Sequence, residues 1–90
     1  MSRVSTHARL QASIDDGRAR IARGERPAFH VRWATAIDGS IDVTVAELPL
    51  IHQFVSDEAG VVDGARFLIA RALEVEPMAF DVGADLPSHD

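Results

Sequence analysis

The chain has 90 residues, the length of one domain, and this excludes two separate hydrophobic cores. Its 47% hydrophobic and 26% charged residues are typical of a folded globular protein and argue against general disorder. No apolar run approaches the roughly 20 residues that span a bilayer, and the N-terminus lacks the apolar core of a signal peptide, so we expect a cytoplasmic protein with no membrane contact. The absence of cysteine excludes disulfides, thiolate metal sites and thiol catalysis, and we expect no cofactor.

The formal net charge of -5 is unevenly distributed along the chain. Residues 1–27 contain six arginines and three acidic residues, whereas residues 28–90 contain three arginines and eleven acidic residues. Long-range fields steer association by sign, so the acidic part favours a basic protein partner over nucleic acid. A weak nucleic-acid contact is left open only for the arginine-rich N-terminal segment, where acidic residues interrupt the basic run.

The first segment predicts a helix over residues 6–23, because Leu10, Ile14 and Ile21 fall on one stripe. A glycine and a proline follow this pattern and are typical of a helix end. The stripe is narrow, so the helix needs an apolar patch elsewhere. We therefore expect residues 1–27 to form a separable helix and linker whose role is contact.

Three strands are predicted next. Apolar and polar residues alternate over residues 28–34 and again over residues 41–46, with Asp38-Gly39 between them as a tight hairpin turn. Pro49 is expected to end the second strand, because proline cannot donate to a strand ladder, and residues 50–55 form the third.

A second helix is predicted after the third strand. Ser56 is a suitable N-cap, acidic residues follow it, and a broad apolar arc continues until Pro77 closes the helix. Residues 78–82 form a short fourth strand, and residues 84–90 form a loose tail. The predicted fold is therefore α+β: an N-terminal helix, then a β-β-β-α-β body over residues 28–83 in which one helix covers a small antiparallel sheet.

The order of these motifs resembles the HicB family of bacterial antitoxins. The resemblance covers about residues 28–76: the apolar strand at residues 29–33, Asp38-Gly39, the segment 43–49 that ends in Glu-Leu-Pro, and the helix that opens at Ser56-Asp57. It implies a fold that is partly related to ribonuclease H.

The resemblance also implies a function. A HicB-like protein is a non-enzymatic antitoxin that binds and neutralises a HicA-like toxin, a small basic RNA-cleaving protein, through a protein interface. Many family members carry a C-terminal DNA-binding domain, and the fourteen residues after Glu76 are too few for one, so operator binding is in doubt. The alternative function is a stand-alone oligomeric or adaptor module with the same fold.

A metal-dependent nuclease is the third hypothesis, and the sequence gives it little support. We expect Asp42, Asp63 and Glu74 to be solvated charges rather than metal ligands. His30 and His52 would share one sheet surface if their strands were neighbours, but no ligand motif accompanies them. The sequence contains neither a nucleophile-elbow motif nor a glycine-rich phosphate loop, so we expect no catalytic residue and no metal site.

Exposed apolar residues give the predicted interface. Phe67 lies off the main apolar arc of its helix, and we expect either the N-terminal helix or a partner to cover it. Trp33 shares the phase of the first strand's apolar residues and is predicted to be in the core. The third strand is a predicted sheet edge, and edges pair readily with another chain, so we expect a homodimer. The predicted interface residues are Phe67, Leu50, His52, Phe54, Leu10, Ile14 and Ile21.

Overall fold

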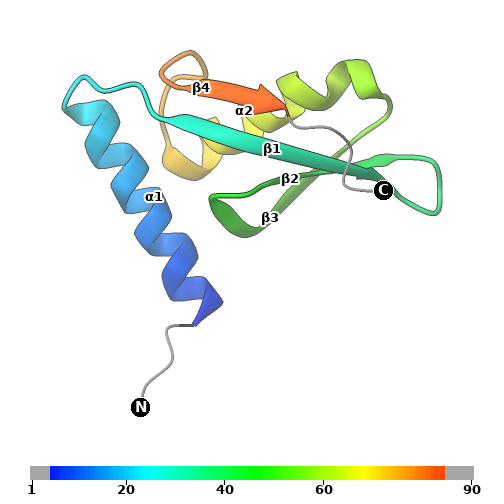
Figure 1. Cartoon of the computed structure of the whole chain (residues 1–90), viewed down its shortest axis with the longest axis horizontal. Helices are drawn as coiled ribbons and strands as arrows, with labels where there is room; N and C mark the ends of the chain where they lie inside the picture. The colour runs from blue at the N-terminus through cyan, green and yellow to red at the C-terminus, as the bar shows by residue number, and fades with distance from the viewer. Residues whose placement is uncertain (1–4, 85–90) are drawn as a thin grey trace.

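The computed structural model describes residues 5–84, which form two main helices and one four-stranded mixed sheet (Figure 1). The elements are, in chain order, α1 (Thr6–Ala22), β1 (Ala28–Thr35), β2 (Ile41–Val45), β3 (Leu48–Val55), the short 3₁₀ helix η1 (Glu58–Gly60), α2 (Val61–Leu73) and β4 (Asp81–Ala84). The α+β class and the β-β-β-α-β order of the body are confirmed. Of the predicted tail, residues 85–90 lie outside the described residues, while residue 84 belongs to β4.

The strand order is β3-β2-β1-β4, with β3 and β4 at the two edges. The first three strands pair antiparallel as a meander, but β4 pairs parallel to β1. The prediction of a wholly antiparallel sheet is therefore wrong. Because α2 returns the chain across the sheet, β4 runs in the direction of β3, which is also the direction of β1.

The core lies between the sheet and α2, which covers one sheet face. Alternate residues of the strands face this core, as the predicted period of two requires. Trp33, which was predicted to be in the core, is partly buried and packs against it. The buried apolar residues are Phe29, Val31, Ile41, Val43, Val45, Leu48, Val61, Ala65, Ile69, Ala70, Leu73 and Phe80.

Helix α1 packs on the end of this core near the start of β1. Its N-cap is Ser5, whose hydroxyl accepts a hydrogen bond from the N–H of Ala8 at 3.0 Å. The stripe of Leu10, Ile14 and Ile21 contacts the core cluster that contains Phe29, Leu48 and Leu73. Helix α1 thus packs against the main core. Of the two predicted covers for Phe67, the N-terminal helix is wrong, because Phe67 is 55% exposed.

The chain between β2 and β3 also differs from the prediction. The second strand ends at Val45, and Pro49 lies inside β3. Proline is tolerated there because β3 is an edge strand, where a missing N–H removes no ladder bond that the sheet needs. The register shifts between Thr44 and Val45, and Leu50 adopts a positive φ of 74°. The third strand therefore begins two residues earlier than predicted and bends near its start.

Helix α2 starts later than predicted. Ser56 is not its cap; the carboxylate of Asp57 instead accepts the N–H of Gly60 at 3.1 Å and caps η1, which leads into α2. The helix ends at Glu74, which takes a left-handed conformation with φ of 58°, and Pro77 follows. Within residues 5–84, neither α1 nor α2 combines the length and apolarity needed to cross a membrane.

Two arginines hold the loop between α2 and β4. Nη1 of Arg66 donates to the carbonyls of Pro77 at 2.7 Å and Phe80 at 3.1 Å, and its guanidinium lies over the Phe80 ring. Arg26 donates to the carbonyl of Met78 and pairs with Asp81 at 2.8 Å. The buried Phe80 ring packs edge-on against Phe29, with 5.6 Å between the ring centroids. The loop is thus fixed although it has no regular structure, and the predicted fourth strand starts three residues later, at Asp81.

Candidate protein interface at the edge strand

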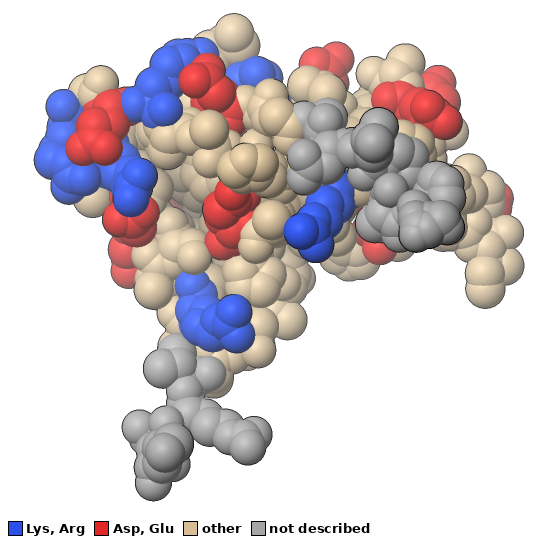
Figure 2. Space-filling model, viewed as in Figure 1, with Lys and Arg blue, Asp and Glu red and all other residues tan. Residues whose placement is uncertain are grey.

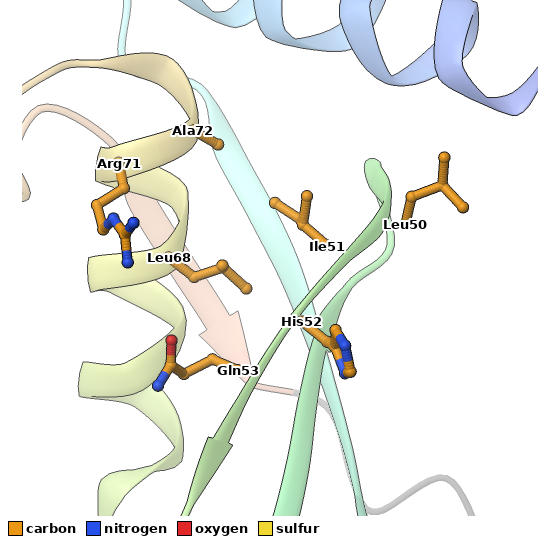
Figure 3. Close-up of a pocket in the computed structure, with 7 residues that line it drawn as sticks. All are labelled: Leu50, Ile51, His52, Gln53, Leu68, Arg71 and Ala72. Carbon is orange, nitrogen blue, oxygen red and sulfur yellow. The ribbon is translucent and has the colours of Figure 1, made fainter.

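A groove of about 420 Å³ lies between the edge strand β3 and helix α2 (Figure 3). In this view Ile51, Leu68 and Ala72 point into the space between the two elements, whereas Leu50 and His52 point away from α2. The groove is lined by Leu50, Ile51, His52, Gln53, Leu68, Arg71 and Ala72. Its mixture of apolar walls and a few polar groups is typical of a site for another polypeptide.

The groove exists because α2 approaches β3 closely at only one end. A Cβ on Gly64 would lie 2.7 Å from Cγ1 of Val55, so this glycine permits direct contact between helix and strand. One and two turns later, Leu68 and Ala72 do not fill the space above Ile51. The edge of the sheet is therefore left open beside the second half of α2.

The edge strand itself carries exposed apolar side chains. Leu50 is 55% exposed and Phe54 is 52% exposed, and β3 has a sheet neighbour on one side only among the described residues. Burial of this exposed apolar area in an interface would stabilise the complex by roughly 25 cal/mol per Å². An open strand with apolar residues is a site for strand addition.

His52 lies between Leu50 and Phe54 on the sheet face that α2 does not cover. Its Nδ1 lies 3.0 Å from Oδ1 of Asp42, and its ring packs edge-on against Phe54 with 5.2 Å between centroids. Asp42 therefore points outward, as predicted. The strands that carry His30 and His52 are not neighbours, because β2 lies between them, so the condition for the two histidines to meet is not fulfilled.

His30 has its own carboxylate partner. Its backbone N–H and its Nδ1 both contact the side chain of Glu47, at 2.8 and 2.5 Å. Each histidine thus pairs with one acidic residue, on separate strands. Across residues 5–84, no three side chains of the kinds that bind metals come together.

Phe67 and Arg71 contact each other on α2, and Arg71 lines the groove. The guanidinium of Arg71 lies over the Phe67 ring at 5.7 Å from its centroid. Arg71 also lines the groove, so the pair joins the exposed surface of α2 to the edge strand. Asp63 lies one turn before Phe67 on the same side of the helix, and its side chain is exposed.

Most arginine side chains gather at one end of the molecule, whereas acidic side chains lie at both ends (Figure 2). Arginine side chains gather over the C-terminal end of α1 and the neighbouring loop, with acidic side chains between them, and acidic side chains lie over the start of α2. Residues 28–84 contain nine acidic residues and three arginines. Only three of these nine, Asp42, Glu47 and Asp81, form an ion pair within residues 5–84.

The predicted site residues divide into two groups. Leu50 and His52 line the groove, while Phe54 and Phe67 are exposed and each contacts a lining residue, His52 and Arg71 respectively. The stripe of α1 is instead packed on the core. The sequence pattern did not identify five groove residues: Ile51, Gln53, Leu68, Arg71 and Ala72. The small residues Gly64 and Ala72 along one helix side were the only signal for them.

Comparison of the chain with known protein families, curated proteins and solved structures gave no match.

Proposed function

We propose that this protein is a non-enzymatic, HicB-like inhibitor that binds and neutralises a small basic RNA-cleaving protein. The observation that carries the proposal is the acidic surface of the body. Six of the nine acidic residues in 28–84 form no ion pair within residues 5–84, so their charge is not neutralised locally. A surface of this sign attracts a basic partner and raises its rate of association.

The three arginines of the body offset only three of these nine acidic charges. Arg66 donates to two backbone carbonyls, and Arg71 lies over an aromatic ring. Glu58 and Glu76, by contrast, are exposed on the outside of the domain. The order of strand, Asp-Gly turn, strand, Glu-Leu-Pro and helix adds the family resemblance from which the partner's chemistry is proposed.

The proposal is tested by co-expression with a small basic protein encoded by a neighbouring gene. We expect the two proteins to co-purify, and we expect growth inhibition by the basic protein to be relieved. The affinity should fall as the salt concentration rises, because exposed charges are screened over about 8 Å at physiological ionic strength. A neighbour that neither binds nor becomes less toxic would contradict the proposal.

Charge-reversal variants test whether the partner binds the acidic body or responds only to the net negative charge of the protein. The double variant Glu58→Lys and Glu76→Lys should weaken binding and slow association. The control is Asp15→Lys on α1, which changes the charge of a single residue outside the acidic body. If the control weakens binding as much as the double variant, the acidic body is not the partner surface.

A further inference from the structure

We propose that β3 pairs with β3 of a second copy of this chain, antiparallel, about a two-fold axis beside His52. The pairing would join two four-stranded sheets into one and place both α2 helices on the same face. Edge strands with exposed apolar residues favour such pairing, and an isologous interface needs a surface that complements itself. Both the strand and the helix beside it meet this condition.

On the strand, the exposed apolar residues lie symmetrically about His52. Leu50 and Phe54 are each two residues away from it, and side chains two residues apart share one face of a strand. In an antiparallel pair centred on His52, Leu50 of each copy lies opposite Phe54 of the other. Two cross-strand apolar pairs would then cover the side chains that are more than half exposed in one copy.

On the helix, the charges lie symmetrically about Phe67. Asp63 is four residues before it and Arg71 four residues after it, so all three lie on one side of α2. In an antiparallel helix pair centred on Phe67, Asp63 of each copy faces Arg71 of the other. The helix therefore offers charge complementarity to a second copy of itself.

The same two-fold axis would relate both the two β3 strands and the two α2 helices. The Cβ position of Gly64 lies within 3.8 Å of Gln53 Cγ, and Leu68 lines the groove with Ile51 and His52. Phe67 is therefore close to level with His52 along the strand direction. Helix α2 contacts β2 and β3 and also β1 and β4. The two α2 helices would therefore lie several strand spacings of about 4.8 Å apart, and exposed side chains such as those of Phe67 and Arg71 would have to reach across this gap.

The backbone of Leu50 supports an intermolecular role for this residue. Its φ of 74° lies in the left-handed region, which a leucine rarely adopts because its Cβ crowds the following carbonyl oxygen. Its side chain is more than half exposed, so burial within one copy does not offset this strain. Strain of this kind is found at functional sites, and Leu50 lies where the second copy would cover it.

The test is the oligomeric state of the full chain, measured by analytical ultracentrifugation over a concentration series. We expect a dimer of twice the 9.7 kDa chain mass. Phe54→Ser should raise the dissociation constant by at least about tenfold, the effect of removing an aromatic anchor. The matched control is Ile37→Ser, because Ile37 is a fully exposed apolar residue at the hairpin, away from β3.

A charge swap tests the register. Asp63→Arg alone and Arg71→Asp alone should each weaken the dimer by placing like charges opposite each other, and the double variant should restore it. Circular dichroism melts confirm that each variant is folded. A wild-type chain that stays monomeric at every concentration, an equal effect of Ile37→Ser, or a double swap no better than the single ones would each overturn the proposal.

The inference does not depend on the proposed function. The dimer rests on β3, Asp63 and Arg71, whereas the basic partner is tested at Glu58 and Glu76. A monomeric Phe54→Ser variant that still binds the basic protein would support the inhibitor function while the dimer is judged by its own measurements.

Discussion

Cδ2 of Leu73 lies 2.8 Å from the point where a Cβ on Gly17 would stand. This distance is below van der Waals contact, so α1 reaches the end of α2 only because residue 17 has no side chain. Cζ of Phe29 lies 3.4 Å from the same point. Helix α1 is thus held by a close backbone approach to the core, and its position depends on one glycine.

Gly17→Ala should lower the free energy of unfolding, measured by urea denaturation. Alanine favours a helix over glycine by about 1 kcal/mol, but overpacking against a fully buried Leu73 costs about 1–3 kcal/mol. We expect a net loss of about 1 kcal/mol. In the double variant Gly17→Ala and Leu73→Val, the loss of unfolding free energy should be smaller than the sum of the losses of the two single variants. Arg18→Ala, on the exposed side of α1, is the control; a neutral or stabilising Gly17→Ala would show that the contact can relax.

Leu50→Gly should be more stable than Leu50→Ala by about 1 kcal/mol, because glycine adopts the left-handed conformation without strain. The comparison is made on thermal unfolding at a concentration where both are monomeric. Phe54 lies in the same strand at an ordinary φ, so Phe54→Gly should be less stable than Phe54→Ala. The same order at both positions would show that the backbone at Leu50 is not strained.

The hairpin turn should contribute stability that is lost in acid. The Ser40 hydroxyl, and then the Ser40 N–H, donate to Asp38 and hold the pKa of Asp38 below its ordinary value of 3.8. Because the folded-state pKa is lowered, the contribution is present above the unfolded value and is lost as the pH falls through the folded value. Ser40→Ala should raise the pKa of Asp38, measured by NMR titration of its carboxyl carbon, and should reduce the acid dependence of the melting temperature.

Arg66→Ala should destabilise the fold by about 1.5–3 kcal/mol, since it leaves the carbonyls of Pro77 and Phe80 without their charged donor. Arg66→Lys should lose less, because an ammonium can still reach one carbonyl but lacks the planar fork of arginine. The measurement is chemical denaturation, with Arg32→Ala on the open sheet face as the control. An Arg66→Ala variant as stable as Arg32→Ala would mean that water replaces the arginine.

Local patterns in the sequence predict the helices and strands, but they do not predict how the strands pair. The Asp38-Gly39 hairpin and the inward alternation of β1 follow from neighbouring residues, and both are confirmed. The parallel pairing of β4 joins residues more than fifty positions apart, so no local period reports it. Pro49 would end a central strand but is tolerated in the edge strand β3, and the local sequence does not report which kind of strand contains it.

The site was predicted only in part for the same reason. The exposure of Leu50 and Phe54 follows from their place on an outer strand, which the sequence indicated. The groove beside them depends on the angle between β3 and α2, and the close contact at Gly64 sets that angle. Phe67 was correctly expected to project from its helix, but the glycine at position 17 gave α1 a different place to pack.

The contact between the rings of Phe29 and Phe80 bears on how the chain is made. A ribosome adds about 5–20 residues per second, so Phe29 is joined to the chain several seconds before Phe80. Until then β1 lacks β4, and the apolar face of the three-stranded meander has no complete cover. During this interval the apolar face of the incomplete sheet is exposed, and chaperones or other nascent chains can bind it.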